Sequence, residues 1–468
     1  MRNAAAETLL STVSATGMAL TEDGFAEHMD SVDPLREHRS SYHIPKMRDG
    51  TAFSYCAGNA MGLQHIHVEA SVEVFLKKWR EQAVGGPCMQ PTPWPEIGQM
   101  CVKDMAAIVG AKDTEVTIMN TLTVNLHLLL TAFYRTQGSK KKLMIAPHSF
   151  PSDGYCLLSL LETRGLNPGE DLIKITAPGT RDWSDPATVI PTEAFLSVIE
   201  KRGDETAVLV VSAVQYLTGQ WFDIPAIVKA ARAKKIIVGV DCSHAVGNVP
   251  LHLHDWDVDF AYWCTCKYLN SGPGSLSGLF VHNKHASCTI PLECLNGLWG
   301  SDIKSCFSEH RRFEPAPGAS PLQISTPSAA CHVLLAPSLK LMASVGMEAI
   351  RQKSLLLTAY LELLVSELIP PGCIDVVTPA NPNQRGAQLS LRILPNKLKL
   401  CQEAVSEYEC GAGGAAETDD TALLQRQLLD KGVIIDMCSP DMVSIAPAPM
   451  YNSFADVLRV VRTLASLF

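Results

Sequence analysis

Short apolar segments alternate with helical segments through the middle of the chain, and this alternation limits the fold more than any other feature. Residues 207–214 (AVLVVSAV), 236–241 (IIVGVD) and 260–266 (FAYWCTC) are rich in β-branched or aromatic side chains, which is typical of buried strands. Residues 225–235 (PAIVKAARAKK) begin with proline and end with lysines, as many helices do. Strands joined by such helices form right-handed crossovers and a mostly parallel sheet.

The length of 468 residues suits a large α/β domain followed by a smaller one. Residues 1–50 are polar and irregular and are predicted to form an arm. Residues 51–330 are predicted to form the large domain, and residues 331–468 a smaller C-terminal α/β domain. The smaller domain is predicted from helices at 347–369 and 453–467 and from strands at 388–393 and 433–436. A Gly/Ala/acid-rich insertion is predicted at 411–420.

Composition excludes several classes of partner. The formal net charge of −9 leaves no basic surface for nucleic acid. The 15 cysteines are scattered without a CxxC pair or zinc-ligand spacing, so we expect no metal site and a reducing compartment. The N-terminus lacks the pattern of a targeting peptide, and no apolar run reaches eighteen residues, so we expect no membrane span and a cytoplasmic protein.

Charged residues follow two of the predicted strands. The second strand ends on Asp241, with His244 three residues later, and the third is followed at once by Lys267. Ligands of open parallel sheets bind at the carboxyl ends of strands, so Asp241 and Lys267 are predicted to face one ligand. Two isolated residues of this kind can equally form a structural ion pair. Pyridoxal 5′-phosphate (PLP), however, needs a lysine for its aldehyde, a carboxylate for its pyridine nitrogen and a side chain stacked on its ring.

A phosphate site is predicted at the start of the segment Asn120-Thr-Leu-Thr-Val-Asn-Leu-His. Polar residues here precede an apolar helix, whose first amides include those of Leu122 and Thr123. Amides at a helix N-terminus bind phosphate well. An ordinary capped helix would have the same local pattern.

Several longer motifs resemble the kynureninase family of PLP enzymes, in order along nearly the whole chain from about residue 50. They are Gly58-Asn-Ala-Met-Gly-Leu-Gln, Phe150-Pro-Ser-Asp153, Asp241-Cys-Ser-His244-Ala-Val-Gly-Asn, Leu253-His-Asp-Trp-Asp-Val-Asp259, Lys267-Tyr-Leu-Asn-Ser-Gly-Pro-Gly and Ala446-Pro-Ala-Pro-Met-Tyr-Asn-Ser453. The resemblance implies a fold-type I (aspartate aminotransferase-like) PLP enzyme that is a homodimer, with the partner subunit completing each site. It also implies hydrolysis of L-kynurenine or 3-hydroxykynurenine at the Cβ–Cγ bond, giving alanine and anthranilate or its 3-hydroxy analogue.

The resemblance further implies roles for individual residues. Lys267 would hold PLP as a Schiff base and carry the α-proton, Asp241 would pair with the pyridine nitrogen, and Phe150 would stack on the ring. Asp153 and His244 would lie beside the ring. The remaining cofactor-binding residues would be Leu122, Thr123, Pro151, Ser152, Ser212, Cys266, Leu298 and Thr326.

The sequence departs from the family pattern mainly around the substrate. The family's tyrosine before the PLP lysine is Cys266, a weaker hydrogen-bond donor that we also count as catalytic. The family's arginine for the substrate carboxylate is Ser444, which cannot form a bidentate pair. Other substitutions in the expected substrate pocket put Ala60 for a serine, Pro87 for a histidine, Thr326 for an asparagine and Leu298 for a tryptophan, unless Trp299 takes that place.

Three interpretations therefore stand. The chain is a kynureninase with a remodelled pocket, in which Arg311, Arg312 or Arg385 replaces the missing clamp. Alternatively, it keeps the PLP chemistry but acts on another amino acid or amine, by decarboxylation or carbon–carbon bond chemistry. In the third interpretation it is a PLP-binding dimer with little activity.

Overall fold

The computed structural model describes residues 3–84, 94–146, 148–176, 189–286, 294–302, 313–399, 420–438 and 441–468. The chain divides into two compact units. We call the first the large unit; it consists of His67–Tyr216 and Trp221–Met347. The second, the small unit, consists of Met1–Ile66, Leu217–Gln220 and Glu348–Phe468.

A seven-stranded sheet forms the centre of the large unit, with strand order β2-β8-β7-β6-β5-β3-β4. Strands β4, β3, β5, β6 and β7 are parallel, whereas β8 is antiparallel to both of its neighbours. The strands are β2 (Val116–Met119), β3 (Lys142–Ile145), β4 (Leu172–Lys174), β5 (Thr206–Ser212), β6 (Ile237–Asp241), β7 (Phe260–Cys264) and β8 (Ser277–Val281). The predicted, mostly parallel sheet is therefore confirmed.

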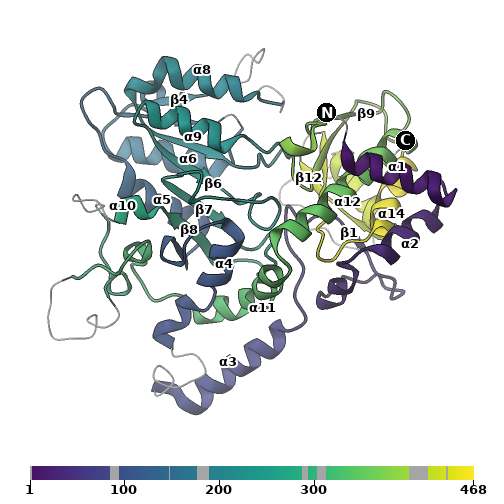
Figure 1. Ribbon diagram of the computed structural model, residues 1–468, viewed down its shortest axis with the longest axis horizontal. Coiled ribbons are helices and arrows are strands. Elements are labelled where there is room, and N and C mark those ends of the chain that lie inside the picture. The colour runs from purple at the N-terminus through teal and green to yellow at the C-terminus, as the bar shows by residue number, and fades with distance from the viewer. Residues whose placement is uncertain are drawn as a thin grey trace. The chain divides into compact units, whose positions relative to one another are not determined.

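Helices cover this sheet (Figure 1). Helix α5 packs on β7 and β8, α9 packs on β6, and α3 packs on the distant α11. A core of apolar side chains from α5, α6 and the sheet, including Phe133, Leu157 and Phe260, lies on one face. The helices of the large unit are α3 (Val68–Gln82), α4 (Val102–Val109), α5 (Leu122–Phe133), α6 (Pro151–Thr163), α7 (Pro168–Asp171), α8 (Thr192–Arg202), α9 (Ile224–Ala233), α10 (Asn283–Ala286) and α11 (Ala329–Val345).

The strand predicted at 260–266 ends two residues early. Regular pairing of β7 with β8 stops at Cys264, whose Cα partner is Ser277. Residues 265–267 then form a bend, because Thr265 turns inward and binds Ser271 and Leu276 through its hydroxyl. Lys267 thus lies in the bend after the strand and not at its end.

The small unit contains two sheets and five helices among its described residues. A four-stranded antiparallel sheet has the order β12-β13-β10-β9, and β1 pairs with β11 in parallel. The strands are β1 (Ser54–Tyr55), β9 (Ile374–Val376), β10 (Leu389–Ile393), β11 (Val433–Ile434), β12 (Asp436–Cys438) and β13 (Met442–Ile445). The helices are α1 (Ala4–Thr16), α2 (Asp23–Val32), α12 (Met347–Leu368), α13 (Asp420–Asp430) and α14 (Phe454–Ala465).

The N-terminal segment is regular rather than irregular, so that part of the prediction is wrong. Helices α1 and α2 bury Leu9 and Phe25 in the core of the small unit. Phe25 contacts Tyr360 of α12, with 5.7 Å between ring centroids, and Tyr360 in turn contacts Phe454 of α14. Several polar residues that suggested an arm are exposed on these helices, among them Glu7, Asp23 and Glu27. The domain boundaries stay a prediction, and most of the predicted insertion at 411–420 lies outside the described residues.

No single helix in the described ranges is long and apolar enough to cross a membrane, although α11 and α12 meet that test when taken as a pair.

Candidate active site

Asp241 ends β6 with a buried carboxylate. Its Cα partner on β5 is Ser212, so the two residues lie level at the carboxyl edge of the sheet. The backbone amide and the hydroxyl of Ser243 donate hydrogen bonds of 2.9 and 2.6 Å to one carboxylate oxygen. Burial raises the pKa of Asp241, while the Ser243 hydrogen bonds and the charge of Lys267 oppose that rise.

Asp153, in the first turn of α6, lies close to Asp241. It is 1 % exposed, and neither carboxylate oxygen has a hydrogen-bond partner of ordinary geometry among the described residues. The Tyr262 hydroxyl, from the middle of β7, is close enough to act on it. Burial, followed by the negative charge of Asp241, raises the pKa of Asp153 well above its usual value.

Lys267 supplies the positive charge near these carboxylates. Its Nζ atom lies 5.8 Å from the centroid of the Phe150 ring. Phe150 is the N-cap residue of α6 and is 38 % exposed as a residue, which leaves a surface for stacking. The charge of Lys267 acts on Asp153 and Asp241 and favours their ionised forms.

His244 completes this group in the turn after β6. Burial, and then the charge of Lys267, lowers its pKa well below the usual value, so the ring is neutral at physiological pH. Its Nδ1 atom has no hydrogen-bond partner among the described residues. Tyr216 lies between His244 and Phe150, with ring-centroid distances of 6.3 and 5.4 Å.

The start of α5 has amides available for an anion. Leu122 and Thr123 are its first two residues, and the first intrahelical hydrogen bond is donated only by Asn125. Thr121, at the cap position, makes no side-chain hydrogen bond to these amides. Asn120 has a φ of 45°, a left-handed conformation that asparagine tolerates better than most residues and that turns the chain sharply from β2 into the helix.

One structural observation, which does not depend on any sequence motif, indicates that these residues fit PLP. Asp153 and Asp241 are two buried carboxylates facing one lysine, and only the Tyr262 hydroxyl acts on Asp153 as a hydrogen-bond donor among the described residues. A protonated pyridine nitrogen would supply a further donor and a positive charge. Phe150 offers a stacking face, Lys267 an amine for the aldehyde, and the start of α5 amides suited to phosphate.

Comparison with known proteins agrees with this reading. The family model for class-V aminotransferases matches residues 103–393, and that for the kynureninase C-terminal domain matches residues 411–464. A kynureninase of Nematostella vectensis is 38 % identical over 99 % of this chain and 97 % of its own. A kynureninase of Myxococcus xanthus is 39 % identical over 94 % of this chain and 96 % of its own. The chain belongs to the kynureninase family.

Solved structures agree on the fold of this kynureninase family member. A C-DES variant with glycine covalently linked to the PLP cofactor has a TM-score of 0.67 at 13 % identity, over 89 % of this chain and 97 % of its own. A cysteine desulfurase of Thermococcus onnurineus has a TM-score of 0.67 at 15 % identity, over 94 % and 98 %. The predicted family, the fold-type I α/β class, the PLP cofactor and the assignment as a PLP-dependent hydrolase are confirmed.

The structure brings together most predicted cofactor residues and leaves others apart. Pro151 and Ser152 lie in the first turn of α6 beside Phe150, and Cys266 directly precedes Lys267. Leu298 is 47 % exposed in a 3₁₀ turn, Trp299 beside it is half-buried, and Thr326 is exposed. No described contact joins Leu298, Trp299 or Thr326 to Lys267, so their roles stay predictions.

Ala60 and Ser444 of the expected kynureninase pocket belong to the small unit, and Pro87 lies outside the described residues. Ser444 is 0 % exposed on β13, and its Cα partner on β10 is Ser390. Its hydroxyl lies 3.1 Å from Gln388 Nε2 and 3.2 Å from the Ser390 hydroxyl. Where the family has a guanidinium, this chain has a small neutral network.

Arg385 does not serve as the replacement clamp within the small unit. Its side chain is buried, and its two terminal nitrogens bind the two carboxylate oxygens of Glu362 at 3.0 and 2.6 Å. A guanidinium held in this way has no free edge for a substrate carboxylate. The other candidates, Arg311 and Arg312, lie outside the described residues.

Three side chains of the site were missed from the sequence. Ser243 lies two residues after Asp241, and Tyr216 lies four residues after β5, so both obey the strand-end rule that we applied to Lys267. Tyr262 lies within β7, two residues before Cys264. Strand alternation places Tyr262 and Cys264 on one face of the sheet, a signal that was present in the sequence.

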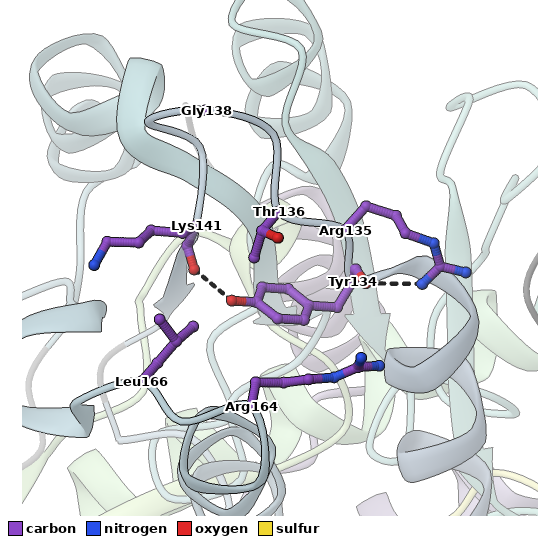
Figure 2. A pocket seen from close by; sticks show the side chains of 7 residues that line it. All are labelled: Tyr134, Arg135, Thr136, Gly138, Lys141, Arg164 and Leu166. Carbon is purple, nitrogen blue, oxygen red and sulfur yellow. Dashed lines mark hydrogen bonds between the residues drawn. The ribbon is translucent and has the colours of Figure 1, made fainter.

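Two other features do not belong to this site. A cavity of about 430 Å³ lies beside Lys141 (Figure 2). Lys141 directly precedes β3, whereas Phe150 follows the other end of that strand. Within the cavity Lys141 pairs with Asp171 at 3.1 Å and accepts a hydrogen bond from Tyr134 at its carbonyl oxygen. It is lined by Tyr134, Arg135, Thr136, Gly138, Lys141, Arg164 and Leu166.

Glu115, His254 and His282 offer three ligand atoms within 4.8 Å of one another, which is close enough for a metal ion. Protein groups, however, already use these atoms. Glu115 accepts hydrogen bonds from the Lys112 and Asn283 amides and contacts His254 Nδ1 at 2.8 Å. His282 Nδ1 accepts from the Lys284 amide at 3.0 Å. The cluster therefore acts as a polar link between β2 and the end of β8.

Proposed function

We propose that this chain cleaves the Cβ–Cγ bond of L-kynurenine or 3-hydroxykynurenine with water, releasing alanine and anthranilate or 3-hydroxyanthranilate. The observation that carries the proposal is the buried pair of carboxylates, Asp153 and Asp241, beside Lys267. Family membership over almost the whole chain supports the same reaction, because the relatives above are named kynureninases.

When bound, PLP withdraws electrons from an attached amino acid, so that a proton can leave Cα and the Cβ–Cγ bond can then break. Lys267 would hold the cofactor aldehyde between catalytic cycles. The Nζ atom of Lys267 would also accept the Cα proton of the substrate and return it. Its half-exposed position in a bend supports this role, since the side chain can move while the strand before it stays in place.

Asp241 would keep the proton on the pyridine nitrogen, and its orientation is fixed by Ser243. Asp153 would support the same edge of the ring, where a positive charge on the cofactor would favour the ionised form that burial and Asp241 oppose. Phe150 would stack on the ring. The buried, neutral His244 would exclude water from the same edge without adding a competing charge.

We further propose that the protein is a homodimer of the cytosol. Nine of the cysteines in the described ranges are free thiols, which supports a reducing compartment. Leu298 and Thr326 are exposed, and no described contact joins them to the cofactor site to which the resemblance assigns them. They would therefore serve the cofactor site of the partner subunit, which supports a dimer.

A second candidate is a PLP enzyme of the same family that acts on a different amino acid. The Ser444 network favours it, since the buried serine, Ser390 and Gln388 bind one another and not a carboxylate. A substrate recognised by a side-chain group other than its α-carboxylate would suit this pocket better than kynurenine.

Anthranilate fluorescence after adding L-kynurenine to the PLP-loaded protein tests the first candidate. We expect release of anthranilate and alanine in equal amounts, and its loss in Lys267→Ala. If no anthranilate forms while the cofactor spectrum changes with other amino acids, the second candidate is correct. A protein whose spectrum responds to no amino acid would contradict both.

A further inference from the structure

Two cysteines flank Thr265 just before the lysine. Thr265 is buried, and its hydroxyl binds the Leu276 carbonyl and lies 2.6 Å from the Ser271 hydroxyl. Because Thr265 turns into the protein here, its neighbours Cys264 and Cys266 are directed to the opposite side. Both side chains are half-buried, so small molecules have access to them.

The two thiols lie on the same side of the chain, opposite to the Thr265 side chain. Each thiol is near enough to the other to change its pKa, and this effect is the largest cause of both pKa shifts. Cys264 shares its face of β7 with Tyr262, and the charges of Asp241 and Lys267 act on it. The thiol pair therefore borders the group of residues that would hold PLP.

We propose that Cys264 and Cys266 are a reversible oxidation site, which hydroperoxides convert to a disulfide beside Lys267. Activity as a readout depends on the function proposed above, whereas the oxidation itself does not.

The chemistry balances with one peroxide per pair. The Cys266 thiolate attacks one peroxide oxygen, the O–O bond breaks, and the leaving hydroxide takes up a proton to become water. The sulfur of Cys264 then attacks the resulting sulfenic acid at sulfur, the S–O bond breaks, and a second water leaves with the Cys264 proton. The two sulfurs together lose two electrons, which reduce the peroxide to water.

Backbone geometry permits the bond. In an extended strand the Cα atoms two residues apart are roughly 6.6 Å from each other, near the upper limit for a disulfide. The strand ends at Cys264 and the bend at residues 265–267 shortens that separation. Closing this ring would also stiffen the segment that carries Lys267.

Cys266 is the attacking sulfur of the pair. The nearby Cys264 thiol, followed by the charge of Lys267, outweighs burial and lowers the pKa of Cys266 to about 6. The same interaction raises the pKa of Cys264. At neutral pH the pair thus holds one thiolate and one thiol, the combination that peroxide oxidation needs.

The test uses the PLP-loaded protein, hydrogen peroxide and mass spectrometry. Trypsin releases the peptide 236–267, which contains Cys242, Cys264 and Cys266. After denaturation and alkylation we expect three alkyl groups on this peptide before oxidation and one, on Cys242, after it. Dithiothreitol should restore all three. Anthranilate release should fall roughly tenfold or more on oxidation and recover on reduction, since a proton-carrying group is lost and regained.

Two variants sharpen the test. In Cys264→Ser the sulfenic acid of Cys266 has no partner, so dimedone should label Cys266 in this variant and not in the wild type. Cys331→Ser, which removes another half-buried thiol of the large unit, should oxidise at Cys264 and Cys266 like the wild type. Three alkyl groups after peroxide treatment, or a disulfide that joins Cys266 to any other cysteine, would overturn the proposal whether or not kynurenine is a substrate.

Discussion

Asp153, at the start of α6, and Asp241, at the end of β6, bring two buried carboxylates so close that the charge of one raises the pKa of the other. Ser243 holds Asp241 by two hydrogen bonds, whereas Asp153 has none of ordinary geometry from the described residues. Without a bound cation, this arrangement costs folding free energy. It is a site organised for a ligand and not for stability.

Asp153→Asn should therefore stabilise the cofactor-free protein and weaken PLP binding. A carboxyl whose pKa is raised by folding contributes stability that is present below its usual pKa, 3.8, and lost as the pH rises through the folded-state value. At pH 7 the variant escapes this loss, so we expect its Tm to exceed that of the wild type by about 2 °C or more. Calorimetry between pH 4 and 8 should show the difference shrinking toward acid.

Asp171→Asn is the matched control for Asp153→Asn. Asp171 is equally buried but pairs with Lys141 at 3.1 Å, so its loss should lower the Tm at pH 7. If Asp153→Asn also lowers the Tm of the cofactor-free protein, the carboxylate pair is not destabilising and this account of the site is wrong.

Lys267→Ala should abolish covalent attachment of PLP. The purified wild type should be yellow and, after borohydride reduction, carry the cofactor on the peptide that contains Lys267. The variant should be colourless after dialysis, because no amine remains beside Phe150. Lys229→Ala, which changes an exposed lysine of α9, should keep the colour. A wild type that stays colourless in excess PLP would contradict the cofactor assignment.

Ser444→Arg should strengthen binding of ligands with an α-carboxylate. A guanidinium offers two parallel donors where the serine hydroxyl binds Gln388 and Ser390, and a charge-assisted pair contributes about 1.5–3 kcal/mol. We expect KM for L-kynurenine to fall about tenfold or more, with kcat changed less. Ser444→Met tests the effect of length without charge and should not lower KM. Efficient turnover by the wild type would show that another cation already binds the carboxylate.

Cys266→Tyr should act on turnover more than on binding. A phenol carries a proton at higher pH than Cys266, whose pKa is about 6. We expect kcat for kynurenine to rise, and its pH profile to lose any inflection near pH 6. Combined with Ser444→Arg, the gain should exceed the sum of the two free-energy changes, since both act on one bound substrate. Strict additivity would mean that the two positions serve different sites.

If the two subunits of a dimer share their active sites, mixing two inactive variants should restore part of the activity. Lys267→Ala and Leu298→Asp should each be inactive alone. If Leu298 serves the partner's site, mixed dimers contain one intact site, and about a quarter of the activity should return on random exchange of subunits. Sedimentation should show a dimer at micromolar concentration. A PLP-loaded monomer, or no recovery on mixing, would contradict the proposed homodimer.

The predictable part of the fold is the part governed by local pattern. The apolar run at 207–214 and the proline-to-lysine segment at 225–235 correspond to β5 and α9 to within two residues at each end. The segment at 1–50 was misread, because α1 buries only Leu9 and has a weak apolar pattern, and α2 is a short helix that buries three side chains. Their place was decided by contacts such as that of Phe25 with Tyr360, which are hundreds of residues apart in the chain.

By itself, the sequence determined the cofactor chemistry of this protein. Asp241 and Lys267 follow strands, and parallel strands bring their carboxyl ends to one edge whatever lies around them. Only the tertiary structure decided which groups of that site are protonated. It also decided which hydrogen bonds are made by the residues that replace the family's substrate-binding side chains. Burial of Asp153 beside Asp241, the closeness of Cys264 to Cys266 and the closed network around Ser444 all depend on which side chains meet across elements. Such contacts set pKa values and hydrogen bonds through the distance between groups and the local dielectric. The spacing of residues along the chain determines neither the distance nor the dielectric.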